Sequence, residues 1–339
     1  EGMTETTTDT QNQPVRTEVR GTTGIITLDR PKALNSLNAE MVEIIQGALN
    51  DWRDDDAIEQ VVIQSSGKHF CSGGDVRAVR DGVLEGDLES VEKFFSEEYA
   101  MNVDIANYPK PYIALCNGVI MGGGMGVSAH ASHMVVTKDA FASMPEMFIG
   151  YITDVGMSWL LQNLPNKASQ GLGAFIGLTG YRMSPDDMLA LGLASHKVAS
   201  LDGVLDGIVE KGVAYLDEVA LEQGESELLQ LSDEASQTFT GSWAEIQEKL
   251  SQASDGLREK VDELTVGASP SALVAAAELF EANASKDLAA AIENEHRLGT
   301  LVYREPDFAE GVRAVLVDKT KDADFAPQPD PEKYRAVLN

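Results

Sequence analysis

The sequence predicts an α/β fold in which short buried strands alternate with helices over about the first 200 residues. Apolar runs with the length of buried strands recur at Gly24–Leu28, Val61–Gln64 and Tyr112–Cys116. Between the first two lies Ala39–Trp52, where apolar residues repeat at helical spacing and Asn38 can cap the helix. Strand, helix and strand in this order form a βαβ unit. We therefore expect parallel strands in a layered fold.

The following segments continue this alternation. Phe70–Val76 is a glycine-bearing loop, and the charged segment Asp81–Asn107 is expected to be helical. Met134–Thr137 is a further strand candidate. We expect residues 1–15 to form a disordered tail, 16–200 the α/β core and 201–339 a helical C-terminal region.

The C-terminal region has helical periodicity throughout. Leu201–Ala268 carries sixteen acidic side chains against four basic ones, on a pattern typical of amphipathic helices with solvated outer faces. Ser269 followed by Pro270 predicts a helix start. A second helix is expected over Leu288–Val302. Asp307 stands three residues before a glutamate, which predicts a capping box that opens a last helix.

Charge and composition exclude several classes of function. The formal net charge of −29 argues against nucleic acid and anionic membranes as partners, because both require a basic surface. No apolar run approaches the roughly 20 residues of a membrane span. The two cysteines, Cys71 and Cys116, lie in apolar contexts, so we expect buried reduced thiols and a cytoplasmic protein.

A second glycine-rich segment follows the strand Tyr112–Cys116. Asn117-Gly118 marks a turn, and three consecutive glycines begin at Gly122. Such glycines suit a place where another group approaches the main chain closely. If a helix begins there, its first amides lack internal partners and form an oxyanion hole in outline. A tight strand–helix turn without a ligand is the alternative, and this stretch alone does not choose between them.

Familiar cofactor and nucleophile motifs are missing. No Gly-x-x-x-x-Gly-Lys-Ser/Thr occurs, and the glycines from Gly122 to Gly126 do not have dinucleotide-binding spacing. Neither Ser72 nor Ser128 lies in a nucleophile elbow. His130 and His133 lack a third nearby ligand. We therefore expect neither a metal nor a resident cofactor.

Two carboxyl groups are candidates for chemistry. Glu146 and Asp154 each interrupt a largely apolar stretch. Apolar surroundings raise the pKa of a carboxyl group and suit it to act as acid, base or nucleophile. The alternative for each is a helix cap or a hydrogen-bonded structural acid.

Two glycine loops and two isolated acids in this order resemble the crotonase (enoyl-CoA hydratase/isomerase) superfamily. The matching stretches are Asp29–Leu37, Phe70–Val76, Asn117-Gly118 with Met121–Gly124, and Pro145-Glu146. The resemblance implies a ββα spiral core and an oxyanion hole for a coenzyme A thioester, formed by the amides of Gly74 and Gly123. It also implies that Lys32, Ala33, Asp75 and Val76 bind coenzyme A, with Lys68, Arg77 and Arg80 as further available cations.

Within the superfamily, the pattern is similar to the 3-hydroxyisobutyryl-CoA hydrolase group. One glutamate of the hydratases matches Glu146, but the other falls on Gly126, which cannot transfer a proton. The hydrolase group matches the stretches Phe94–Tyr99, Asp154–Gly156, Leu178–Arg182 and Asp307–Lys319. This similarity implies thioester hydrolysis in valine degradation, with Glu146 and Asp154 as catalytic acids and Glu98 binding the substrate's hydroxyl beside Gly123.

Departures from that group leave the acyl group open. Thr153 stands where the group has proline, and Met157 replaces a glycine. Hydration or isomerisation of an enoyl-CoA is the first rival function, and a non-catalytic acyl-CoA-binding protein is the second. The family's trimers make a homo-oligomer one expectation. A C-terminal region that folds back over its own site is the other.

Overall fold

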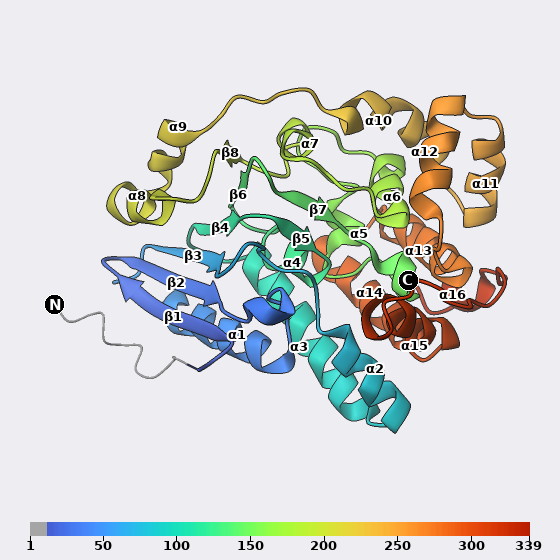
Figure 1. Ribbon diagram of the computed structural model, residues 1–339, viewed down its shortest axis with the longest axis horizontal. Helices are drawn as coiled ribbons and strands as arrows, with labels where there is room; N and C mark the ends of the chain where they lie inside the picture. Colours follow the sequence, from blue (N-terminus) through green and yellow to red (C-terminus); the bar gives the residue numbers. More distant parts are fainter. Residues whose placement is uncertain (1–11) are drawn as a thin grey trace. The chain divides into compact units, whose positions relative to one another are not determined.

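The computed structural model describes residues 12–339, which form two compact units that alternate along the chain (Figure 1). The first unit contains the described residues up to Gly74, Ala100–Ala142 and Met183–Ser226. The second contains Asp75–Tyr99, Ser143–Arg182 and Glu227–Asn339. Most of the predicted tail lies outside the described residues, although Val15 already belongs to a strand. The predicted division at residue 200 stays a prediction.

The first unit is built on a six-stranded sheet in the order β1-β2-β3-β4-β6-β8 (Figure 1). Strands β1 and β2 pair antiparallel, and every later pair is parallel. A second sheet pairs β5 with β7. The strands are β1 (Val15–Arg20), β2 (Thr23–Leu28), β3 (Gln60–Ser65), β4 (Tyr112–Cys116), β5 (Val119–Met121), β6 (His133–Thr137), β7 (Phe141–Ser143) and β8 (His196–Val198).

The predicted βαβ unit is confirmed. Helix α1 (Ala39–Arg53) connects β2 to β3, and Asn38 caps it by accepting a 2.9 Å hydrogen bond from the Met41 N–H. Helix α1 packs on β1 and β2. Gly24 permits this packing, because a Cβ there would lie 2.4 Å from the Trp52 ring.

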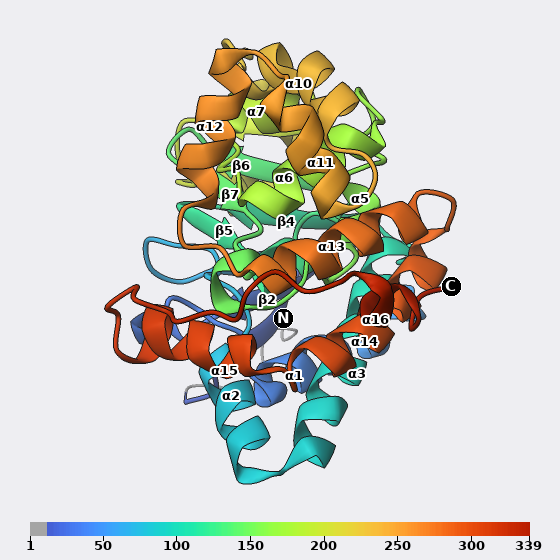
Figure 2. The same cartoon turned by 90° about the vertical axis from the view of Figure 1, so that its right-hand side faces the viewer.

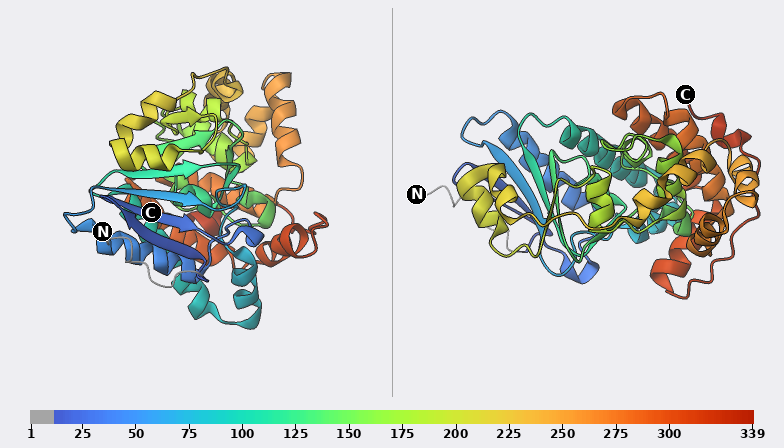
Figure 3. Two further views of the ribbon diagram at one scale, coloured as in Figure 1. Left: turned by 60° about the vertical axis from the view of Figure 1, so that its left-hand side comes forward. Right: turned by 90° about the horizontal axis from the view of Figure 1, so that it is seen from above.

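One apolar cluster of the first unit lies between the sheet and two of its later helices. Short helices α8 (Val204–Lys211) and α9 (Tyr215–Val219) lie beside the strands (Figure 3). Buried Ile208 and Leu216 pack there against Ile113 of the central strand β4. The same unit contains η2 (Pro31–Ala33), α4 (Gly123–Gly126), α7 (Pro185–Ala190) and η4 (Gly212–Ala214).

The second unit is largely helical (Figure 2). Its long helix α13 packs against α14 and α6, and its small side chains permit close approach. The predicted start at Ser269 is confirmed, since this residue caps α13. The helices are η3 (Glu146–Ile149), α5 (Met157–Leu160), α6 (Gln170–Thr179), α10 (Glu227–Thr238), α11 (Trp243–Ser251), α12 (Asp255–Thr265), α13 (Pro270–Asn283), α14 (Leu288–Val302) and α16 (Glu332–Arg335).

The charged segment Asp81–Asn107 is two helices rather than one. Helix α2 (Val76–Glu85) ends at Gly86, whose φ of +79° places it in the left-handed region. Helix α3 (Leu88–Ala106) begins two residues later and continues from the second unit into the first. Glycine in this conformation terminates a helix at little steric cost.

The predicted capping box at Asp307 is wrong. Helix α15 (Pro306–Val312) begins earlier, with Glu305 at its N-cap position. Asp307 lies inside the first turn, where its buried carboxyl group accepts hydrogen bonds from the Ser269 and Ser271 hydroxyls. A π-helical turn, η5 (Arg313–Val317), then follows α15. The Asp307 carboxyl group therefore bonds hydroxyl groups that are distant in sequence, and it does not cap its own helix.

Both cysteines are free and buried, as predicted. Burial raises the pKa of the Cys116 thiol above its usual range, which makes it unreactive. Within residues 12–339, no helix combines the length and the apolar character needed to cross a membrane.

Candidate functional site

The two glycine loops run side by side in the first unit. The backbones of Cys71 and Ile120 form an isolated parallel β-bridge. The Met121 N–H also donates a 3.0 Å hydrogen bond to the Cys71 carbonyl. A second isolated β-bridge pairs the backbones of Gly74 and Leu37. The structure thus brings the two predicted oxyanion-hole loops together, although they are far apart in sequence.

Close backbone approach explains the glycines of the second loop. A Cβ on Gly124 would lie 2.6 Å from the Cys71 carbonyl oxygen, a distance that real Cβ atoms do not tolerate. Gly122 has a φ of +52°, and Gly123 then opens α4. The N–H of a residue at the start of a helix has no partner inside the helix. Gly123 therefore meets the local requirement for an oxyanion donor.

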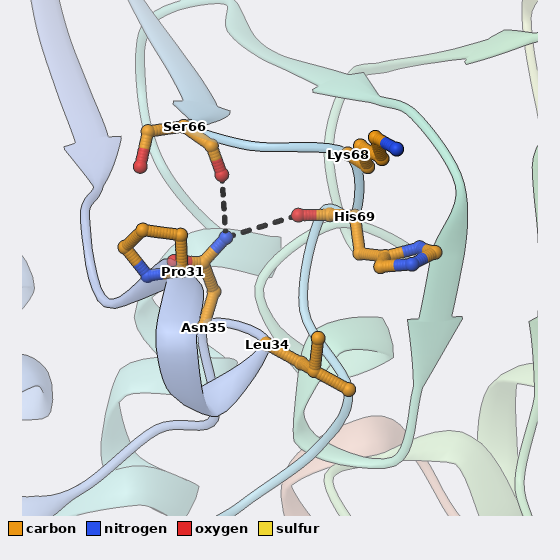
Figure 4. A pocket seen from close by; sticks show the side chains of 6 residues that line it. All are labelled: Pro31, Leu34, Asn35, Ser66, Lys68 and His69. Atoms are coloured by element: carbon orange, nitrogen blue, oxygen red, sulfur yellow. Dashed lines mark hydrogen bonds between the residues drawn. The ribbon is translucent and has the colours of Figure 1, made fainter.

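A pocket of about 250 Å³ lies beside the first loop (Figure 4). Asn35 organises it by donating 2.9 Å hydrogen bonds to the carbonyls of Ser66 and His69. Lys68 brings a cation to its wall. The predicted coenzyme A residues Lys32 and Ala33 are in η2 next to it, whereas Asp75 and Val76 are at the start of α2 in the second unit.

Three predicted acids are buried in the second unit. Glu98 is on α3, Glu146 opens η3 and Asp154 lies in the loop before α5. Their exposed fractions are 2%, 6% and 6%. The electrostatic interaction of Asp154 with each of the two glutamates places the three acids in one cluster.

A pair of tyrosines completes this cluster. The Tyr99 hydroxyl donates a 2.7 Å hydrogen bond to Oδ2 of Asp154, and it lies 2.9 Å from the Tyr151 hydroxyl. Phe95 stacks on the Tyr151 ring at 5.5 Å between centroids. Neither tyrosine was predicted from the sequence to be a site residue. Tyr99 follows Glu98 directly, but no local pattern predicts its contact with Asp154.

Burial strongly perturbs the acids. Burial and the neighbouring Asp154 raise the pKa values of Glu98 and Glu146 well above their usual range. Burial raises the pKa of Asp154 to about 7, against the opposing hydrogen bond from Tyr99. Oε2 of Glu98 and Oε1 of Glu146 are buried without a hydrogen-bond partner. These two oxygens can therefore serve a ligand, and the cluster can exchange protons near neutral pH.

A further buried acid next to this cluster, Glu295, was not predicted from the sequence. Glu295 of α14 is fully buried and bonds the loop that follows Asp154. Burial raises the pKa of Glu295 to about 8. Its position in the sequence carried a signal, because it shares the apolar stripe of its helix with Ile292 and Leu298.

His130 lies in a turn just before strand β6. His133 belongs to β6, and its ring stacks on that of His196 at 6.5 Å between centroids. Across residues 12–339, no group of three or more potential ligands is arranged to hold a metal ion.

Comparisons with known proteins agree with this architecture. The profile of the enoyl-CoA hydratase/isomerase family matches residues 23–336. The mitochondrial 3-hydroxyisobutyryl-CoA hydrolase of Danio rerio is 36% identical over 323 residues, which are 91% of this chain and 83% of that protein. The human enzyme of the same name is 34% identical over 345 residues, which are 96% of this chain and 88% of that protein.

Solved structures give the same fold. A crystal structure titled as an enoyl-CoA hydratase from Rhodobacter sphaeroides aligns with a TM-score of 0.86 at 34% identity, covering 96% of this chain and 97% of that one. One titled as a carnitinyl-CoA dehydratase from Mycobacterium thermoresistibile aligns with a TM-score of 0.85 at 33% identity, covering 97% and 98%. The predicted fold class is therefore confirmed.

Proposed function

Because this chain belongs to the enoyl-CoA hydratase/isomerase family, we propose that it hydrolyses the thioester of a 3-hydroxyacyl-CoA. Its substrate is 3-hydroxyisobutyryl-CoA, and its products are 3-hydroxyisobutyrate and free coenzyme A, in a step of valine breakdown. Relatives that bear the name of this activity align over nine-tenths of the chain or more. Their similarity supports the substrate as well as the reaction.

The observation that carries the proposal is the buried acid cluster of the second unit. Glu98 and Glu146 each hold an unpartnered oxygen, and Asp154 has a pKa of about 7. Leaving a buried carboxyl oxygen without a partner is unfavourable, so a ligand is expected to satisfy it. A protein that only bound an acyl-CoA would not need three such acids.

The thioester carbonyl is polarised by backbone amides in this mechanism. The N–H groups of Gly74 and Gly123 donate to its oxygen as negative charge develops there. Each such donor contributes roughly 3 kcal/mol to transition-state stabilisation, so two amides suffice without a metal ion. No side chain has to move a proton at this point of the reaction.

The carboxyl groups perform the acyl transfer. Glu146 in its ionised form attacks the carbonyl carbon, or activates a water molecule that does so, and the bond to sulfur breaks. Asp154 shares the proton transfers and protonates the departing thiolate. Water then adds and the carboxylic acid is released, which balances the hydrolysis. Glu98 binds the 3-hydroxyl group of the substrate through its unpartnered oxygen.

Coenzyme A binding is assigned to the residues predicted from the sequence. Lys32 and Ala33 in η2, with Asp75 and Val76 at the start of α2, contact the nucleotide. Lys68 on the wall of the adjacent pocket offsets phosphate charge on an otherwise acidic protein. The coenzyme enters as part of the substrate, and no resident cofactor, nucleic acid or membrane is required.

The compartment and the oligomeric state are also proposals. The free thiols Cys71 and Cys116 fit the reducing cytoplasm. The relatives, in contrast, carry mitochondrial names. A homo-oligomer remains an expectation from the sequence.

Hydration of an enoyl-CoA is the second candidate, and similarity to the Rhodobacter sphaeroides protein described as an enoyl-CoA hydratase favours it. Gly126 opposes it, because it lies in α4 where hydratases have their second glutamate. Loss of a general acid or base typically lowers a rate by about 10² to 10⁴.

One experiment separates the two candidates. Release of free thiol from 3-hydroxyisobutyryl-CoA and loss of enoyl absorbance from a matched enoyl-CoA are measured on the same preparation. We expect thiol release to dominate and Glu146→Gln to abolish it. Glu293→Gln, at an exposed position of α14, is the control and should leave it unchanged. Faster loss of enoyl absorbance, or undiminished thiol release by Glu146→Gln, would refute the assignment.

A further inference from the structure

Asp154 sits at the start of an unusual turn. The Met157 N–H closes the turn by donating a 2.9 Å hydrogen bond to the Asp154 carbonyl. Both central residues are in the left-handed region, with φ of +52° at Val155 and +82° at Gly156. Glycine adopts this conformation readily, but a β-branched residue does so only under strain. Surrounding contacts must therefore hold the turn in place.

Glu295 supplies contacts of this kind. One of its carboxyl oxygens accepts a 2.8 Å hydrogen bond from the N–H of Gly156, the second left-handed residue of the turn. The other accepts from the N–H and the hydroxyl of Ser158, at 3.2 and 2.5 Å. Glu295 is fully buried, so no water can replace it as an acceptor.

The bonds of Glu295 distinguish its role from those of the other acids. Glu98 and Glu146 each have a buried oxygen without a partner, whereas both oxygens of Glu295 are engaged by the chain itself. Three of the roughly four acceptor sites of this carboxyl group are thus occupied by the chain itself. Its three donors also balance the unfavourable burial of a carboxyl group.

A buried amide network anchors the same turn to the C-terminal helices. Asn283 of α13 donates 2.8 Å to the Ser158 hydroxyl, and Asn294 of α14 donates 2.8 Å to Asn283. The N–H of Asn339, the last residue, donates 2.9 Å to Asn294. A chain of hydrogen bonds thus connects the C-terminal helices to the residues that follow Asp154.

We propose that Glu295 is a positioning residue that holds the left-handed Asp154 turn and thereby keeps the Asp154 carboxyl group on the Tyr99 hydroxyl. The inference rests on the proposed thioester hydrolysis for its kinetic consequence. It extends the site to a residue that lies 141 positions after Asp154 and touches no substrate in the proposed mechanism.

The kinetic test uses Glu295→Gln, with Glu293→Gln on the same helix as the matched control. Glutamine replaces one carboxyl oxygen by an NH2 group, which cannot accept a hydrogen bond from a backbone N–H. One hydrogen bond to the turn is therefore lost. Displacement of a reacting group by about 1 Å can cost about 100-fold in rate. We expect kcat to fall about 10- to 100-fold while KM stays within about threefold. A kcat within twofold of wild type overturns the proposal.

A double-mutant cycle tests whether the turn is the route of the effect. Val155→Gly accepts a positive φ without strain, so it should need Glu295 less. We expect Glu295→Gln to lower kcat less in the Val155→Gly background than in the wild type. Equal losses in both backgrounds overturn the proposal. If Glu295→Gln does not fold, Ser158→Ala removes one donor and should lower kcat about threefold; an unchanged kcat overturns it.

Hydrogen exchange separates this inference from the proposed function. If wild-type protein releases no coenzyme A, the proposed function fails, but the turn can still be examined. Whichever of the Gly156 and Ser158 amides faces the glutamine NH2 group loses its acceptor, so that amide should exchange about tenfold faster in Glu295→Gln than in Glu293→Gln. Equal exchange rates in the two variants would overturn the positioning role whatever the activity.

Discussion

The Tyr99 hydroxyl donates a 2.7 Å hydrogen bond to Oδ2 of Asp154, and both side chains are buried. Burial and the nearby Asp154 raise the pKa of Tyr99 well above its usual range, so its hydroxyl remains a donor at every working pH. The bond favours the ionised form of Asp154 against the effect of burial. Tyr99 therefore lowers the pKa of Asp154 from the value that burial alone would give it.

Tyr99→Phe should move the pH dependence of the reaction upward. The variant loses the bond that lowers the pKa of Asp154, so that pKa rises above about 7. A hydrogen bond to a charged group contributes about 1.5–3 kcal/mol, or roughly one to two pH units. The limb of the kcat/KM profile that reports Asp154 should shift by that amount. Tyr181→Phe, whose hydroxyl bonds Glu227 instead, is the control. An unmoved limb in Tyr99→Phe would contradict the prediction.

Glu98→Gln should weaken recognition of the substrate's hydroxyl group. Because burial raises the pKa of Glu98 and favours its neutral form, the bond is worth about 0.5–1.5 kcal/mol, and its loss corresponds to roughly a 2- to 10-fold rise in KM for 3-hydroxyisobutyryl-CoA. Isobutyryl-CoA lacks that hydroxyl, so its KM should change little. Thiol release from both substrates provides the measurement. An equal effect on the two substrates would remove Glu98 from this role.

Stability should fall as the pH rises through neutrality. Burial raises the folded-state pKa of Asp154 from 3.8 to about 7 and that of Glu295 from 4.5 to about 8. Between the unfolded and folded values, the native state holds protons that the unfolded state has released. Each such group lowers the free energy of unfolding by about 1.4 kcal/mol per pH unit in that window, and its stabilising effect is complete only below the unfolded pKa.

Urea unfolding at pH 5.5 and 7.5 measures this dependence. Wild-type protein should be less stable at pH 7.5. Glu295→Gln removes one titrating group, so its stability should depend less steeply on pH, whereas Glu293→Gln should follow the wild type. Stability that is constant or increasing over this interval would show that the cluster is not neutralised in the folded state.

Two glycine-to-alanine substitutions should change the free energy of unfolding in opposite directions. Gly124→Ala places a methyl group against the Cys71 backbone, and such overpacking lowers the free energy of unfolding by about 1–3 kcal/mol. It should also reduce thiol release, because the adjacent Gly123 amide moves. Gly47→Ala, in α1 with no atom near the new methyl group, should stabilise by about 0.4–1 kcal/mol. Thermal unfolding of both variants checks the pair, and a stable, fully active Gly124→Ala would argue against the close loop contact.

Local signals predicted the regular elements well. The strand Tyr112–Cys116 and the helix Leu288–Val302 occur within the expected bounds, because apolar periodicity and length decide such elements locally. The cap at Asn38 is equally local. Asp307 failed as a cap because Ser269 and Ser271, more than 30 residues away, bond its carboxyl group.

The sequence by itself determined the α/β class, the two glycine loops and the isolated acids Glu146 and Asp154, whereas Glu98 was predicted only from the family resemblance. These depend on residue type and short-range spacing, and comparison with the family motifs added their expected roles. Only the tertiary structure decided which groups those acids meet. The bonds from Tyr99 to Asp154 and from Gly156 to Glu295 join residues 55 and 139 positions apart. No local pattern encodes such pairings, because burial in a shared core brings the partners together.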